Sequence, residues 1–162
     1  MKHTLLILCA CSVFVIGASN GLGQTSTNQS TRVSSSEKKR ITGAVHAVLE
    51  AQRDAWNRGD IGGYMDGYER SPDIIFISGD SISRGWQTVH DRYKKNYDSR
   101  EKMGTLTFSN LETTVYNKNL VVTIGSWHLQ RANDAPHGRF TVIFQRTRQG
   151  WRIVHDHTSS AN

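Results

Sequence analysis

The order of its periodic segments constrains the fold of this chain more than any other feature. Apolar residues recur at helical spacing from Ile41 to Trp56. Near residue 103 the pattern changes to that of strands, in segments at about 103–116, 120–132, 139–148 and 150–158. The short polar or glycine-containing connections between these segments predict antiparallel neighbours. Helices that come first and long strands that come last are typical of an α+β domain.

Local signals between these two blocks predict two more helices and a hairpin. Gly59 is placed to end the first helix, and Asp60 is placed to cap a short second one. Residues 74–78 are mostly β-branched or aromatic and pair with 81–84 in a brief hairpin. A third helix follows Gly85. We therefore expect a cone-shaped, curved antiparallel sheet wrapped around three N-terminal helices.

The N-terminal residues have a sequence pattern that predicts segments outside the folded domain. A basic residue precedes about twelve apolar residues and then small ones, which predicts a secretory signal peptide over residues 1–23. Residues 24–36 are almost all polar and predict a disordered linker, so that the domain spans 37–160. We expect a secreted or periplasmic protein; a lipoprotein signal at Cys11 is the less favoured alternative. Both cysteines lie in the signal segment, so the mature protein would contain no disulfide.

Charge and hydropathy argue against two classes of partner. The net charge is +6, but the basic residues are scattered and form no stripe, so we expect no nucleic acid partner. The N-terminal apolar run is too short to cross a bilayer as a helix, so we expect no stable membrane insertion.

Four short motifs carry a resemblance to a known family. They are Ala55-Trp-Asn-Arg-Gly-Asp60, the step from Tyr68 to Ser-Pro-Asp73, Arg84-Gly85, and Gly150-Trp…Val-His-Asp-His-Thr-Ser159. Residues 37–160 resemble the nuclear transport factor 2-like superfamily, and within it the SnoaL-like branch of unknown function, related to ketosteroid isomerase and to the association domain of calcium/calmodulin-dependent kinase II. The resemblance implies a curved sheet around a pocket and a homodimer formed through the sheet. It implies no single activity, because members include isomerases, cyclases, dehydratases, epoxide hydrolases and assembly modules.

The last strand contains two histidines that flank an aspartate. Strict alternation places Arg152, Val154, Asp156 and Thr158 on one face and Trp151, Ile153, His155 and His157 on the other. The resemblance suggests that the face with Asp156 lines the pocket. A partly desolvated carboxylate there suits a general base. Its candidate partners are Tyr64, Tyr93 or an arginine, and a tyrosine hydroxyl is the candidate electrophile. If the faces are reversed, His157 becomes the acid/base candidate.

Apolar and aromatic residues from both blocks are the candidate walls of the pocket. They are Trp56, Tyr68, Phe76, Trp86, Tyr93, Trp127, Val142 and Phe144. Such a lining predicts a small apolar or aromatic ligand.

Metal and cofactor chemistry have weaker support. His155 and His157 could be two ligands of one ion, and His128 could share their face. No third ligand has a diagnostic spacing, so packed or interfacial histidines are favoured and we expect no metal. The sequence contains no glycine-rich phosphate loop, nucleophile elbow or dinucleotide-binding fingerprint, and we expect no cofactor.

Two functions remain open at this point. One is an exported protein that binds a small molecule in its pocket and catalyses proton-transfer chemistry of the isomerase, cyclase or hydratase type. The other is a non-catalytic binding or assembly module, a dimer with Ile143, Ile153, His155 and His157 near the interface on the convex face of the sheet.

Overall fold

The computed structural model describes residues 33–161. The predicted signal peptide at 1–23 and most of the predicted linker at 24–36 lie outside the described residues. The first helix, α1 (Ser35–Asn57), begins two residues before the expected start of the domain. Its N-cap is Ser34, whose hydroxyl accepts a hydrogen bond from the backbone N–H of Glu37 at 3.2 Å. Ser36, which also suits a cap, lies inside the first turn.

The second and third helices begin where the sequence predicts them. Asp60 accepts a hydrogen bond from the Gly63 N–H at 2.8 Å and caps α2 (Ile61–Met65). The hairpin of β1 (Ile75–Ser78) and β2 (Ser81–Arg84) follows, and then α3 (Trp86–Asn96). One further helix, α4 (Arg100–Met103), was not expected from the sequence. It is a single turn, too short to show an apolar period.

Four long strands complete the domain. They are β3 (Thr105–Asn117), β4 (Leu120–Gln130), β5 (His137–Thr147) and β6 (Gly150–Thr158). The sheet has the order β2-β1-β6-β5-β4-β3, and all neighbours are antiparallel except β1 and β6, which run parallel. The expected antiparallel sheet is thus mixed at this one junction. The chain passes from the edge strand β2 through α3 and α4 to the opposite edge strand β3, and β6 then returns to lie beside β1.

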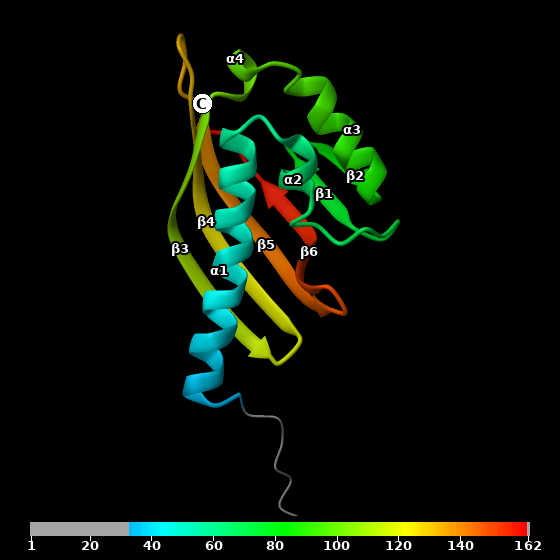
Figure 1. Ribbon diagram of the computed structural model, residues 1–162, viewed down its shortest axis with the longest axis vertical. Helices are drawn as coiled ribbons and strands as arrows, with labels where there is room; N and C mark the ends of the chain where they lie inside the picture. Colours follow the sequence, from blue (N-terminus) through cyan, green and yellow to red (C-terminus); the bar gives the residue numbers. More distant parts are fainter. Residues whose placement is uncertain (1–32, 162) are drawn as a thin grey trace, which may run out of the picture.

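The sheet curves around the helices, as expected (Figure 1). α1 crosses the inner face of β3 to β6, while α2 and α3 lie on the side of the β1–β2 hairpin. A register shift between Ser109 and Glu112 marks a bulge in β3, where Asn110 has a φ of 52°. Bulges increase local twist and bend a strand, which helps an open sheet to curl. The α+β cone is therefore confirmed.

The expectation of strict alternation along β6 is wrong. Ile143 pairs with His155, but the next residue, Phe144, pairs with Ile153, so Val154 is an extra residue in β6. This bulge changes which face each side chain takes. As a result Ile153 and Asp156, three residues apart, are both buried against the helices. Trp151 is buried as well.

Buried side chains from the helices and the inner face of the sheet form one apolar core. Val45 on α1, Val121 on β4 and Phe144 on β5 have no exposed surface. Within residues 33–161, no helix is both long and apolar enough to cross a membrane.

Candidate functional site

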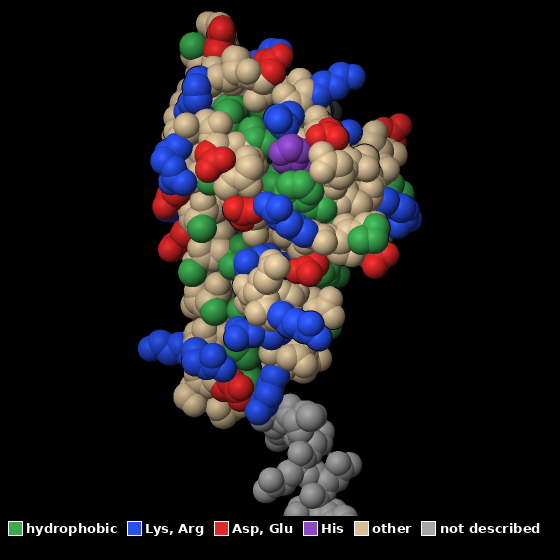
Figure 2. Space-filling model, turned by 45° about the vertical axis from the view of Figure 1, so that its right-hand side comes forward, with side chains coloured by type: hydrophobic (Ala, Val, Ile, Leu, Met, Phe, Trp, Pro, Cys, Tyr) green, Lys and Arg blue, Asp and Glu red, His purple; other side chains and the backbone are tan. Residues whose placement is uncertain are grey.

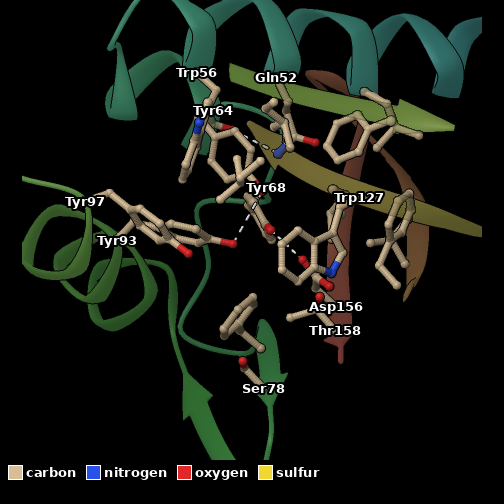
Figure 3. Close-up of a pocket in the computed structure, with 18 of the residues that line it drawn as sticks. Gln52, Trp56, Tyr64, Tyr68, Ser78, Tyr93, Tyr97, Trp127, Asp156 and Thr158 are labelled. Atoms are coloured by element: carbon tan, nitrogen blue, oxygen red, sulfur yellow. Dashed lines mark hydrogen bonds between the residues drawn. The ribbon is translucent and has the colours of Figure 1, made fainter. Parts of the chain in front are cut away.

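A cavity of about 140 Å³ lies between the helices and the inner face of the sheet (Figure 3). Most of its wall is aromatic or aliphatic. Six of the eight predicted pocket residues line it, together with Tyr64 and Asp156; they are Trp56, Tyr68, Phe76, Tyr93, Trp127 and Val142. A cavity of this size in an engineered protein core holds one benzene ring. The cavity is therefore small, and aromatic side chains form much of its wall.

Two predicted wall residues, Trp86 and Phe144, do not line the cavity. Trp86 stacks on His90 with ring centroids 4.9 Å apart, and its indole N–H donates to the Met65 carbonyl oxygen at 3.0 Å. These contacts hold the Trp86 ring between α3 and the end of α2. Phe144 is fully buried in the core, next to the bulge in β6. Helical and strand periodicity predicted that both rings are buried, but periodicity does not distinguish a core position from a cavity wall.

The decisive polar group of the cavity is Asp156, which is only 6% exposed. The Tyr68 hydroxyl donates a hydrogen bond to its Oδ2 at 2.6 Å. Its Oδ1 is buried and has no hydrogen-bond partner within the described part of the chain. Burial raises the pKa of Asp156 to about 7, although the hydrogen bond from Tyr68 acts to lower it. The carboxyl group is therefore poised to exchange a proton near neutral pH.

The position of Asp156 follows from the strands beside β6. Asp156 lies opposite Val142 of β5 and Phe76 of β1, and all three line the cavity. The β6 bulge brings the Asp156 side chain to the same inner face as Ile153. A carboxyl group on the inner face of a sheet beneath packed helices is desolvated, and that is the physical cause of its raised pKa.

The hydroxyl groups of Tyr64 and Tyr93 meet beside this carboxyl group. Their oxygens lie 3.4 Å apart. Burial is the largest cause that raises the pKa of Tyr64 and of Tyr93, and the charge of Asp156 raises both further. Both hydroxyls therefore keep their protons at neutral pH. The hydrogen bond between them uses one of their two hydroxyl protons, and the other proton can be donated to a bound molecule.

Gln52 is a lining residue whose role was not foreseen from the sequence. Its side chain is 1% exposed, and its Nε2 donates to the backbone carbonyl of Tyr64 at 2.9 Å. This bond ties α1 to α2 and holds the backbone of Tyr64 in place. The signal that could have revealed it is a polar residue within the apolar stripe of α1.

The face with the two histidines is outside the cavity. His157 is exposed and does not line the cavity, so the alternative in which it enters the pocket is wrong. His155 is half-buried in the sheet opposite Ile143. Ile153 was expected on the outer face with them but is 1% exposed and lines the cavity. Among residues 33–161, no three His, Cys, Asp or Glu side chains cluster closely enough to hold a metal ion.

Comparisons with known proteins agree with this architecture. Residues 45–162 match the sequence model of the SnoaL-like domain family. The chain belongs to the SnoaL-like domain family. An NTF-2 like protein of unknown function from Shewanella oneidensis is 34% identical, with a TM-score of 0.70 over 73% of this chain and 98% of its own. No curated protein matches the chain.

Two more distant structures share the fold of this SnoaL-like domain. An NTF2-like superfamily protein from Salmonella enterica is 20% identical, with a TM-score of 0.61 over 77% of this chain and 94% of its own. A ketosteroid isomerase-like protein from Erwinia carotovora is 14% identical, with a TM-score of 0.60 over 74% and 95% of the two chains. The nuclear transport factor 2-like fold expected from the sequence motifs is thereby confirmed.

The mouth of the cavity in this SnoaL-like domain is more polar than the cavity interior. Asn96, near the end of α3, and Ser160, just after β6, are exposed residues of the lining. Half-buried Ser78, Arg92 and Thr158 also line it. The cavity therefore has polar groups where it meets solvent, an aromatic wall, and one carboxyl group that is almost fully buried.

Proposed function

We propose that this protein binds a small one-ring carbonyl compound in the cavity and moves a proton between two of its carbon atoms, as an isomerase does. The observation that carries the proposal is the buried Oδ1 of Asp156, which lies in the cavity wall and, within the described residues, has no hydrogen-bond partner. An unpaired buried carboxyl oxygen is costly to stability, so its retention points to a functional role.

The cavity groups have complementary roles in such a reaction. Ionised Asp156 removes a proton from a carbon next to the carbonyl group, and the C–H electron pair becomes part of an enolate. A hydroxyl group of the Tyr64–Tyr93 pair donates a hydrogen bond to the enolate oxygen. Protonated Asp156 then returns the proton to another carbon of the same molecule. Tyr68 orients the carboxyl group through its bond to Oδ2.

Two features support this choice of chemistry. A base is most effective when its pKa lies near the working pH, and the pKa of Asp156 is about 7. The cavity of about 140 Å³ accommodates one ring rather than a fused ring system. The fold of a ketosteroid isomerase-like protein is consistent with the proposal but does not carry it.

Cyclohex-3-enone is a suitable probe, because it has one ring and becomes the conjugated cyclohex-2-enone when one proton moves. We expect the protein to accelerate this conversion, followed by ultraviolet absorbance. Asp156→Asn keeps the shape of the side chain but removes the base, and should lower the rate by about 10²- to 10⁴-fold. His157→Asn changes a side chain on the outer face and should leave the rate unchanged. Equal rates for the wild type and Asp156→Asn would contradict the proposal.

We also propose that the protein is exported and forms a homodimer through the outer face of the sheet. The signal-peptide pattern of residues 1–23 supports export, and a mature N-terminus at Gln24, measured by mass spectrometry, is the expected outcome. On the outer face, Ile124 is 44% exposed, and Val122 and Ile143 lie beside it at half-buried positions. Among residues 33–161 no helix packs on this face, and apolar side chains on such a sheet face support association of two copies.

A further inference from the structure

We propose that the ligand carries an anionic group, most simply a carboxylate, on its ring, and that Arg92 binds this group at the mouth of the cavity. This inference rests on the proposed function, because it names the class of compound that the Asp156 cavity takes. It assigns to Arg92 the role of a specificity-determining residue.

In the described part of the chain, the charge of Arg92 has no carboxylate partner. Arg92 lies on α3, is half-buried and lines the cavity. Its guanidinium carbon lies 5.6 Å from the ring centroid of Phe76, another cavity residue. No carboxylate within residues 33–161 comes within 4.0 Å of this guanidinium group. A partly desolvated guanidinium group with five donors and no anion beside it is suited to bind one from outside.

A second arginine adds to the positive potential at the same place. Arg131 pairs with Asp134 through Nη1 at 3.3 Å, while its buried Nε has no hydrogen-bond partner in the described range. The charges of Arg131 and Arg92 both affect the pKa of Tyr97, whose ring lines the cavity. Burial raises the pKa of Tyr97, and the two guanidinium charges oppose that rise. Both guanidinium groups therefore lie near one edge of the cavity. Because Asp134 offsets the charge of Arg131, the attraction for an anionic molecule at this edge comes mainly from Arg92.

The guanidinium group of Arg92 and the carboxyl group of Asp156 do not form an ion pair. The groups that shift the pKa of Asp156 are its own burial and the Tyr68 hydrogen bond, and Arg92 is not among them. Arg92 therefore does not neutralise the Asp156 carboxyl group, and its charge remains available to a ligand. A ring that fills the aromatic interior would place its reacting carbon near Asp156 and its carboxylate near Arg92. In Figure 3 the labelled rings of Tyr93 and Trp127 lie on either side of the space that such a ring would occupy.

Benzoate and benzamide provide a matched pair of probes, because they have the same ring and nearly the same shape but differ in charge. Isothermal titration of the purified protein at pH 7 should show benzoate binding about tenfold or more tightly than benzamide. Arg92→Gln should bring the two affinities to within about twofold by weakening benzoate alone. Arg148→Gln removes an exposed arginine from the turn between β5 and β6 and should keep the preference.

The possible results separate this inference from the proposed function. Equal binding of benzoate and benzamide by the wild type would overturn the anionic ligand while leaving the one-ring cavity in place. A preference for benzoate that survives Arg92→Gln would overturn the role of Arg92. A preference lost equally in Arg148→Gln would show that general surface charge is responsible and would also overturn it. Failure of both probes to bind would count against the proposed function and this inference together.

Discussion

Replacing Asp156 with Asn should make the stability of the protein much less dependent on pH. The ordinary pKa of this carboxyl group is 3.8, and burial raises it to about 7 in the folded protein. The folded state therefore holds the proton over a range of pH in which the unfolded chain has released it. A group of this kind gives its full stabilisation below pH 3.8, and that stabilisation is lost as the pH rises through about 7.

The size of this effect follows from the shift in pKa. A rise of about three units, at about 1.4 kcal/mol per unit, corresponds to roughly 4 kcal/mol of unfolding free energy. The Asn side chain is neutral at every pH and can still accept the Tyr68 hydrogen bond. We expect wild type and Asp156→Asn to have similar stability near pH 4, and the variant to be more stable by up to roughly 4 kcal/mol near pH 8.

Urea denaturation at one-unit intervals from pH 4 to pH 8 measures this difference directly. Asp80→Asn is the control, because it removes a carboxylate of the same type from an exposed turn. Its difference from the wild type should not grow by several kcal/mol over the same range. A difference between wild type and Asp156→Asn that is constant with pH would show that the pKa of Asp156 is not raised in the folded protein. A wild type that gains stability relative to the variant as the pH rises would contradict the raised pKa too, since it would mean that Asp156 is folded as a stabilised anion.

Three further predictions concern neighbouring features. Tyr68→Phe removes the hydrogen bond that lowers the pKa of Asp156, so the loss of stability with pH should move to higher pH in the same urea series. Phe144→Ala leaves a void in the core and should lower the free energy of unfolding by about 3–5 kcal/mol, measured at one pH; a cost below about 1 kcal/mol would contradict its place in the core. Ile124→Asp should leave the thermal melting temperature nearly unchanged and convert a dimer to a monomer in sedimentation velocity; an unchanged mass would argue against the outer-face dimer.

Much of the fold was predictable because periodicity reports long elements well. The helical period of α1 and the long strands β3 to β6 each bury one face, and burial imposes the pattern on the sequence. The caps at Gly59 and Asp60 were predictable because a positive φ and an exposed helix end each require particular side chains. The single-turn α4 was missed because four residues cannot show a period.

The candidate site was harder to predict from sequence periodicity than the fold was. An extra residue such as Val154 in β6 shifts the alternation by one, and no two-residue pattern in the sequence marks where this occurs. Asp156 was correctly placed on the inner face only because of the family resemblance. Alternation misplaced Trp151 and Ile153, which are also on the inner side. The unpaired Oδ1 of Asp156 and the meeting of two tyrosine hydroxyls depend on tertiary packing.

The pKa of Asp156 itself can be measured directly. The side-chain carboxyl carbon of Asp156, labelled with ¹³C and assigned by comparison with Asp156→Asn, can be followed by NMR from pH 3 to pH 9. We expect a titration midpoint near 7. A midpoint near 4 would show that the carboxyl group is solvated or paired with a cation, and would contradict its role as the base of this cavity.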